Sequence, residues 1–447
     1  MKRVFAVFLT VLTVLCLAAG CAPETPPESD PPATPSEPAG PYQFRSAELE
    51  KYAIVYADDN PDYFDLACQL SDRIYTQYGK LLTTVRDTNS TPTEYEILLG
   101  DTNRSDHTGS VMEYSVTVED GMFRINVGGS FSAEKAVDFL CRQLFNGQEF
   151  ALENGEYYHT SFLTGPQELE AGASVRIMTA NILADAFAGE AYQKAYYRGE
   201  LFAGMLVAYT PDVVGLQEAD ESWNAVLDGY LAKLEKTHGI AYARLLPSYQ
   251  DKVNYTSLIY RSDKFRAGDS GVNVFRWWTD GAFRHNYHMR NISWARLSSL
   301  EDPDQSFIVA NTHWSYRTEH AGGNTYLTGS AAPIAANELR LQCKEETNAF
   351  MSALKKTYPD TPIFLTGDFN TSLSFFTDSG WTPESFRVIS QEALKAGKAI
   401  SRVPASGHYD HLFGTGSYTI YLYGLVGDSQ QHSALTDHPF AYVDLGF

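Results

Sequence analysis

Several short apolar runs in the C-terminal part of this chain end directly on a polar residue. The pattern recurs in "VRIMTAN" (175–181), "VVGLQE" (213–218), "FIVANTH" (307–313) and "IFLTGDFN" (363–370). Apolar runs of this length, bounded by turn signals, predict buried strands. Because helical stretches such as 336–357 separate some of them, we expect an α/β fold with stacked sheets and helices outside.

The residues at these ends are of the types that bind a hard cation and a phosphate group. They are Asn181, Glu218, His313, Asp368 and Asn370, followed near the C-terminus by Asp410, Asp437 and His438. Strand alternation predicts that Asp368 and Asn370 point the same way. The alternative for this pair is a turn in which both side chains bond their own backbone. Taken singly, every one of these residues has such a structural explanation, but together they predict one site.

Residues 46–165 predict a separate small α/β unit. Strands are expected at 52–57 and 95–102, a hairpin at 114–129, and helices at 62–79 and 132–145 with Ser132 as the N-cap. No dense cluster of His and acidic residues occurs here, so we expect this unit to be non-catalytic. Cys68 and Cys141 fall on the two helices, and both a disulfide and a pair of buried free thiols remain open.

The N-terminus has the features of an export signal. Lys2 and Arg3 precede an apolar run that ends in "LAAGC" at Cys21. This arrangement resembles a bacterial lipoprotein signal (1–20), in which Cys21 is lipidated, and an ordinary secretory signal is the alternative. Eight of the next twenty residues are Pro, so 21–45 predicts an extended tether. We therefore expect an extracytoplasmic protein that is lipid-anchored to the bacterial cell membrane.

The net charge of −21 excludes a non-specific nucleic-acid coat, which needs cations to displace the counterions of phosphate. It does not exclude an enzyme that meets phosphate through a metal ion.

Residues 172–447 resemble the endonuclease/exonuclease/phosphatase superfamily of metal-dependent phosphoesterases. The resemblance rests on "NIL", "LQE", "NTH", "GDFN", "YDHLF" and "TDHPF", which occur in the family's order. "YYRGELFAGMLVAYTPDVVGLQE" and "RNISWARL" are most similar to the branch that contains deadenylases, nocturnin and uncharacterised bacterial relatives. The resemblance implies a four-layer α/β/β/α sandwich with one catalytic site.

It also implies roles for the strand-end residues. Glu218 would be the principal ligand of Mg²⁺, with Mn²⁺ as the alternative, and Asn181 and Asp437 would help to hold the metal. His438 would be the general base, oriented by Asp410. The remaining three residues would act on the reacting groups: Asp368 would align the nucleophile, Asn370 would bond the developing phosphoryl charge, and His313 would bind phosphate or protonate the leaving oxygen.

Two basic and aromatic segments, 275–291 and 313–320, are candidates for a substrate-binding rim. The candidates in them are Arg290, Arg317 and His288, with Arg284 and His285 as further members. Trp277 and Trp278 are better explained as core residues of a strand.

The sequence therefore predicts an exported, tethered phosphoesterase that hydrolyses a phosphodiester or phosphomonoester. The substrate class is open between nucleotides or nucleic acids and other phosphorylated molecules, and we expect a monomer. The first unit resembles the domain that precedes many glycoside hydrolase barrels, which implies glycan contact. The alternative function is a surface module that binds a glycan or the envelope and retains the fold without turnover.

Overall fold

The computed structural model describes residues 43–104, 107–276, 289–316, 331–378, 386–401, 408–427 and 429–447, with the backbone only for 331–337. Residues 41–447 form one compact unit. The predicted signal, Cys21 and most of the tether lie outside the described residues. So do Trp277, Trp278, Arg284, His285, His288 and Arg317. Within the described residues, no helix combines the length and the apolar character needed to span a bilayer.

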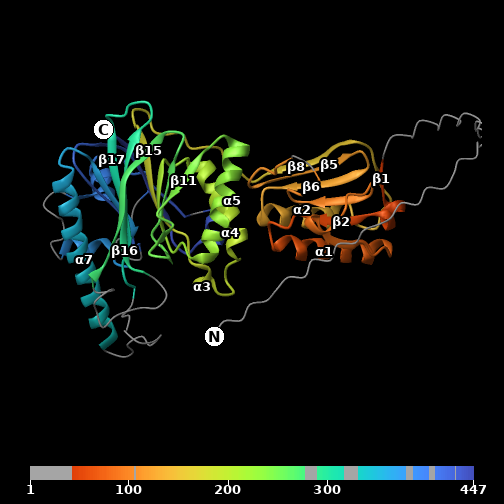
Figure 1. The fold of residues 1–447 in the computed structure, drawn as a ribbon, viewed down its shortest axis with the longest axis horizontal. Helices are drawn as coiled ribbons and strands as arrows, with labels where there is room; N and C mark the ends of the chain where they lie inside the picture. Colours follow the sequence, from red (N-terminus) through yellow and green to blue (C-terminus); the bar gives the residue numbers. More distant parts are fainter. Residues whose placement is uncertain are drawn as a thin grey trace, which may run out of the picture. The chain divides into compact units, whose positions relative to one another are not determined.

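A six-stranded sheet is formed by residues 53–161. Its strands follow the order β3 (Thr83–Arg86), β2 (Ala53–Tyr56), β4 (Glu96–Leu99), β6 (Met122–Val127), β5 (Glu113–Glu119) and β8 (Gly155–Ser161). Helices α1 (Asp62–Tyr78) and α2 (Ser130–Gln143) lie on one face of it (Figure 1). Tyr63, Leu70 and Ile74 of α1 pack in its core, because they recur at helical spacing. Cys68 and Cys141 are both free and half-buried.

In this unit the predicted hairpin turn is confirmed, whereas the predicted helix N-cap is wrong. The hairpin turns at Asp120 and Gly121, whose φ angles of 50° and 83° match the left-handed turn that such a dipeptide favours. The prediction of Ser132 as an N-cap is wrong, because α2 begins at Ser130 and its N-cap is Gly129. The Ser132 hydroxyl lies one turn inside and accepts the amides of Gly128 and Gly129 at 2.9 and 3.2 Å.

Residues 175–446 form two larger sheets. The first has the order β11 (Tyr242–Leu245), β14 (Leu258–Arg261), β10 (Val213–Gln217), β9 (Val175–Asn181), β22 (Phe440–Gly446) and β21 (Thr419–Val426). The second has the order β15 (Phe265–Val274), β16 (Asn291–Ser299), β17 (Ser306–His313), β18 (Ile363–Asp368), β20 (Asp410–Thr415) and β19 (Arg387–Val388).

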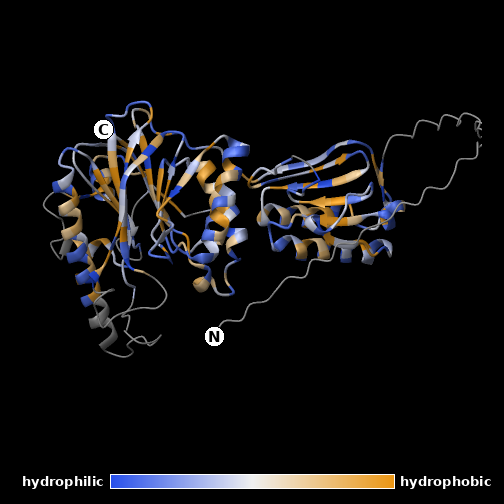
Figure 2. Ribbon diagram, viewed as in Figure 1, coloured by the Kyte–Doolittle hydropathy of each residue, from blue (hydrophilic) through white to orange (hydrophobic). Residues whose placement is uncertain are grey.

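The two sheets pack face to face and helices cover their outer faces. One core cluster combines Val175, Ile177 and Val443 of the first sheet with Phe307, Val309 and Phe364 of the second. Helices α4 (Ala195–Tyr209) and α5 (Glu221–His238) pack on the first sheet, and α7 (Ala331–Thr357) packs on the second (Figure 1). This is the predicted α/β sandwich. Its central strands are buried on both faces, which explains their continuous apolar runs (Figure 2).

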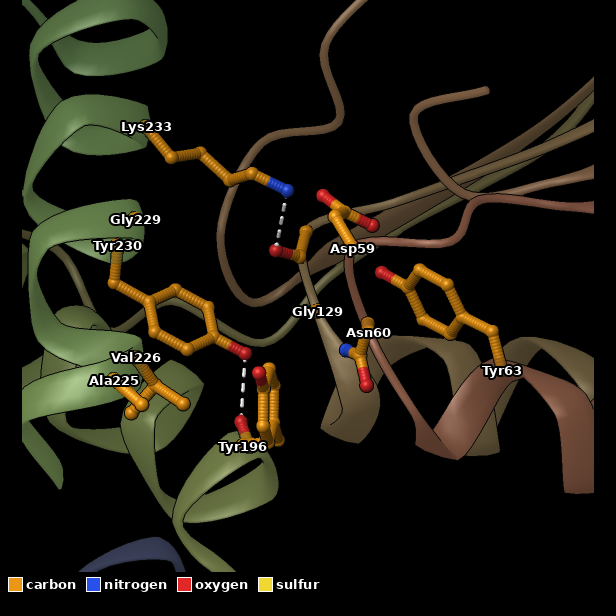
Figure 3. A pocket seen from close by; sticks show the side chains of 11 residues that line it. Asp59, Asn60, Tyr63, Gly129, Tyr196, Ala225, Val226, Gly229, Tyr230 and Lys233 are labelled. Carbon is orange, nitrogen blue, oxygen red and sulfur yellow. Dashed lines mark hydrogen bonds between the residues drawn. The ribbon is translucent and has the colours of Figure 1, made fainter. Parts of the chain in front are cut away.

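Glu200 of α4 joins the sandwich to the small sheet. Its buried carboxylate accepts the backbone amides of Met112 at 2.8 Å and Ser132 at 3.0 Å. It thereby supplies the cap that Ser132 does not. Burial raises the pKa of Glu200, and the hydrogen bonds from Ser132 and Met112 oppose that rise. Nearby, Lys233 of α5 donates to the Gly128 carbonyl at 2.9 Å beside a cavity of about 160 Å³ (Figure 3).

We expect Glu200→Ala to lower the free energy of unfolding by about 2–6 kcal/mol, since it leaves two buried amides without an acceptor at roughly 1–3 kcal/mol each. Denaturant unfolding of the purified protein measures this change. Glu235→Ala, an exposed position on α5, is the control and should change stability little. Equal stabilities of the two variants would contradict the capping role.

Candidate active site

The sheet topology brings the predicted strand-end residues to one place. Strands β9 and β10 are parallel, with Asn181 beside Gln217, and the chain continues from Gln217 to Glu218. Strands β17 and β18 are also parallel, and they end together at His313 and Asp368. Strand β20 runs antiparallel to β18, so its first residue, Asp410, lies opposite Asp368. One edge of each sheet therefore carries part of the site.

The Asn181 side chain connects the two sheets. Its Nδ2 donates to Glu218 Oε1 at 3.1 Å and to Asp368 Oδ2 at 3.0 Å. Its Oδ1 accepts the amide of Leu183 at 3.0 Å, while Glu218 Oε2 accepts the amide of Ala184 at 2.9 Å. A carboxylate from each sheet is thus held at a fixed separation by one neutral amide.

Three backbone positions around these side chains have left-handed φ angles. They are Leu183 at 57°, Glu218 at 64° and Asn370 at 50°. Residues other than Gly rarely adopt this region, and such strain persists only where the surroundings impose it. The bonds from the Leu183 and Ala184 amides to Asn181 and Glu218 are part of those surroundings.

Asp368 and Asn370 form a turn and also belong to the cluster of strand-end residues. Asp368 Oδ1 accepts the backbone amide of Asn370 at 2.8 Å, as the turn alternative requires. Asp368 Oδ2 also lies 3.3 Å from His313 Nε2, and Asn370 Nδ2 lies 3.0 Å from the same nitrogen. Burial alone would raise the pKa of Asp368, but the neighbouring imidazoles of His313 and His438 together with the Asn370 amide hold that pKa below its ordinary value.

His438 and Asp410 form a buried pair. Nδ1 of His438 lies 2.7 Å from Asp410 Oδ2, and the Asp410 side chain is 1% exposed. Burial disfavours the imidazolium, but the carboxylates of Asp410, Asp368 and Asp437 outweigh it and raise the pKa of His438 to about 11. Burial raises the pKa of Asp410 to about 6. We take the stabilised imidazolium as the dominant effect, because three carboxylates surround that ring.

The donor set of this site fits a divalent cation. Glu218, His313 and Asp368 can place ligand atoms within 4.8 Å of one another, and Asp368, Asp410 and His438 can do the same. Among the described residues, neither Glu218 nor Asp368 forms an ion pair with Lys or Arg. The buried Oδ1 of Asp410 has no hydrogen-bond partner among the residues that the structure describes. Closely spaced carboxylate oxygens with His but no Lys or Arg partner in the described part of the chain suit Mg²⁺ or Mn²⁺.

Two predicted residues lie less centrally. Asp437 belongs to neither group of ligand atoms; its side chain is 55% exposed and its Oδ1 is 4.0 Å from His438 Nε2. Arg290 is buried directly before β16.

The sequence analysis missed Asn311 and Gln217, which connect the sheets beneath the site. Gln217 Nε2 donates to Asn311 Oδ1 at 2.6 Å, and Asn311 Nδ2 donates to the Leu216 carbonyl at 2.7 Å. Both amides stand within the quoted motifs, in "LQE" and "NTH". Their place inside otherwise apolar strands was the signal, because a buried amide needs a partner.

The chain is similar to several solved structures. No curated protein matches the chain. Among solved structures, a mannosyl-6-phosphatase from Bacteroides thetaiotaomicron is 18% identical and covers 61% of this chain and 100% of its own, with a TM-score of 0.45. The human nocturnin catalytic domain is 16% identical, with 61% and 94% covered and a TM-score of 0.44. TDP2 from D. rerio with a single-strand DNA product is 17% identical, with 61% and 99% covered and a TM-score of 0.41.

The profile of one protein family matches residues 178–438, which is more than half of the chain and spans every strand-end residue named above. The chain therefore belongs to the endonuclease/exonuclease/phosphatase family of phosphoester hydrolases.

Proposed function

We propose that the protein hydrolyses a phosphoester by attack of a water molecule. A divalent cation would bind beside Glu218, and we expect it to be Mg²⁺, with Mn²⁺ as the alternative. The observation that carries the proposal is the close approach of Glu218 and Asp368, which the Asn181 amide bridges. Two carboxylates so placed repel each other unless a cation or a proton lies near them. Family membership supplies the reaction class.

Glu218 would hold the cation, with Asp368 in the same group of ligand atoms. Asn181 would help to hold the metal site by positioning both carboxylates through Nδ2. When bound, the cation supplies a Lewis acid that polarises a phosphoryl oxygen and offsets its negative charge. Asp437, which is exposed and 4.0 Å from His438, would contribute from the rim.

His438 would take the proton of the attacking water at Nε2, because Nδ1 is engaged with Asp410. A pKa near 11 keeps the ring protonated in the metal-free protein. His438 would become available as a base near neutral pH where the negative charge that favours its protonated form, including that of Asp368, is offset. Metal binding and base activation are therefore linked through the charge of one cluster.

Asp368, Asn370 and His313 would act on the other side of the reacting group. Asp368 would align the water, since its carboxylate faces both His313 and Asn181. Nδ2 of Asn370 donates to the Trp314 carbonyl at 2.9 Å and lies 3.0 Å from His313 Nε2. Asn370 would bond the developing phosphoryl charge where substrate displaces the contact between these two nitrogens, and His313 would bind phosphate or protonate the leaving oxygen.

The wider setting of the reaction rests on the sequence. The signal and Cys21 support export and lipid anchoring of the protein to the cell membrane, and the small sheet would add glycan contact. The acidic charge of the chain does not exclude a phosphate substrate that the enzyme meets through a cation. The substrate is a phosphodiester or phosphomonoester, with nucleotides and nucleic acids as the first class to test and phosphorylated sugars as the second.

Removal of the metal should abolish activity. We expect EDTA to stop hydrolysis of a chromogenic phosphodiester, and excess Mg²⁺ or Mn²⁺ to restore it. Glu218→Gln should lose most of the activity and bind Mn²⁺ weakly in calorimetry, whereas Glu235→Gln on the exposed face of α5 should match the wild type. Full activity in chelator, or full activity of Glu218→Gln, would contradict the proposal and favour a protein without turnover.

The general base has its own signature. His438→Gln should lower kcat by about 10²–10⁴, the usual contribution of a positioned base, while it retains Mn²⁺ binding. Asp410→Asn should lower kcat as well, because the ring loses its orienting carboxylate. Steady-state kinetics at saturating Mg²⁺ measure both variants. Wild-type kcat in His438→Gln would rule out this base.

Stability in chelator should report the raised pKa of His438. The ring is protonated in the folded protein up to about pH 11, but only up to about pH 6.5 in the unfolded chain. Its contribution is therefore fully present below pH 6.5 and is lost as the pH rises towards 11. We expect the stability difference between wild type and His438→Gln, measured by denaturant unfolding, to shrink from pH 6.5 to pH 10. A difference that is constant or grows would be inconsistent with this charge state.

A further inference from the structure

We propose that Arg198 is a positioning residue. It fixes the turn at 182–184, which follows Asn181, relative to the loop at 435–438, which carries His438. This inference rests on the proposed function. Arg198 lies on α4, is fully buried, and has no direct bond to the strand-end residues in the described part of the chain. Its guanidinium instead donates to backbone carbonyls of the loops that carry the strand-end residues.

The first contact is with the turn that follows Asn181. Arg198 Nη1 donates to the carbonyls of Ile182 at 2.9 Å and Leu183 at 2.7 Å. The amides of this same turn, at Leu183 and Ala184, bond the side chains of Asn181 and Glu218. Leu183 has a φ of 57°, so the turn needs external bonds to keep the conformation that aims those amides.

The second contact is with the loop that leads to His438. Arg198 Nη1 also reaches the carbonyl of Leu435 at 3.3 Å. The next residue, Thr436, donates its hydroxyl to the Asn181 carbonyl at 2.8 Å and accepts the amide of His438 at 3.3 Å. Arg198 and Thr436 thus connect the same two loops at successive residues.

Further contacts hold the guanidinium itself in place. Nη2 pairs with Asp185 at 2.6 Å, Nε donates to the Gln193 carbonyl at 2.8 Å, and the group lies 5.0 Å from the centre of the Trp223 ring. Trp223 Nε1 in turn donates to the Leu183 carbonyl. A planar fork with five donors can serve carbonyls from several directions, which the single ammonium of Lys cannot do.

The chain offers a matched control in Arg176. This second buried arginine lies at the start of β9, pairs with Asp444 and donates to the carbonyls of Gln167, Glu168 and Tyr209. Arg176→Lys therefore carries a similar structural burden, but none of its bonds reaches a loop of the site.

The test compares Arg198→Lys with Arg176→Lys in the full-length protein, by calorimetric titration with Mn²⁺, thermal unfolding and steady-state kinetics. We expect both variants to have a lower Tm. Only Arg198→Lys should bind Mn²⁺ about 10–100-fold more weakly, the range typical of residues that orient metal ligands, with a loss in kcat that exceeds any change in KM. Equal Mn²⁺ affinity in the two variants would overturn the inference.

A second pair of variants covers the case in which Arg198→Lys does not fold. Thr436→Val keeps the shape but removes the bond to Asn181, whereas Thr436→Ser keeps it. We expect kcat to fall about tenfold in Thr436→Val, the equivalent of one hydrogen bond, and to stay near wild type in Thr436→Ser. Equal kcat in both would overturn the connection between the loops. A wild type that neither binds Mn²⁺ nor cleaves a phosphoester would instead overturn the proposed function, and this inference with it.

Discussion

The contact on which the site depends is the hydrogen-bonded bridge of the Asn181 amide between Glu218 and Asp368. Each carboxylate comes from a different sheet, so the bridge exists only when the two sheets are stacked in one register. Holding two carboxylates together in a partly buried cluster is unfavourable without a positive charge. The imidazoles of His313 and His438 offset part of the negative charge, and under the proposed function a divalent cation would offset the rest with the oxygen ligands that it prefers.

The rest of the sandwich serves to keep that contact fixed. Beneath it, Asn311 and Gln217 bond across the sheets, and Thr366 donates to Asn311 at 3.0 Å. These buried polar groups are satisfied by one another, which specifies a single packing of the sheets. Around the contact, the left-handed backbone at Leu183 and Glu218 is held by amide and guanidinium bonds. The bonds between Asn311 and Gln217 and the bonds to the loop backbone together fix the geometry of the cluster.

The sequence predicted the α/β sandwich, the main strands and the residues at their ends, because apolar runs and terminal polar residues are local patterns. It could not predict the groups that act at long range. Ser132 looked like an N-cap, whereas the N-cap residue is Gly129 and the Ser132 amide bonds the carboxylate of Glu200, 68 positions away in the chain. Arg198 stands in the quoted segment "YYRGELFAGMLVAYTPDVVGLQE", but nothing local reveals that its partners are carbonyls at 182, 183 and 435. Asp437 was grouped with the metal ligands by its motif, but it is half exposed beside His438.

The central claim is that this one cluster binds a divalent cation, and anomalous scattering from a Mn²⁺-soaked crystal tests it most directly. The account predicts an anomalous peak in direct contact with a carboxylate oxygen of Glu218, on the side that faces Asp368, at a separation of about 2.0–2.3 Å. No peak in this cluster at saturating Mn²⁺, or a peak that contacts neither Glu218 nor Asp368, would contradict it.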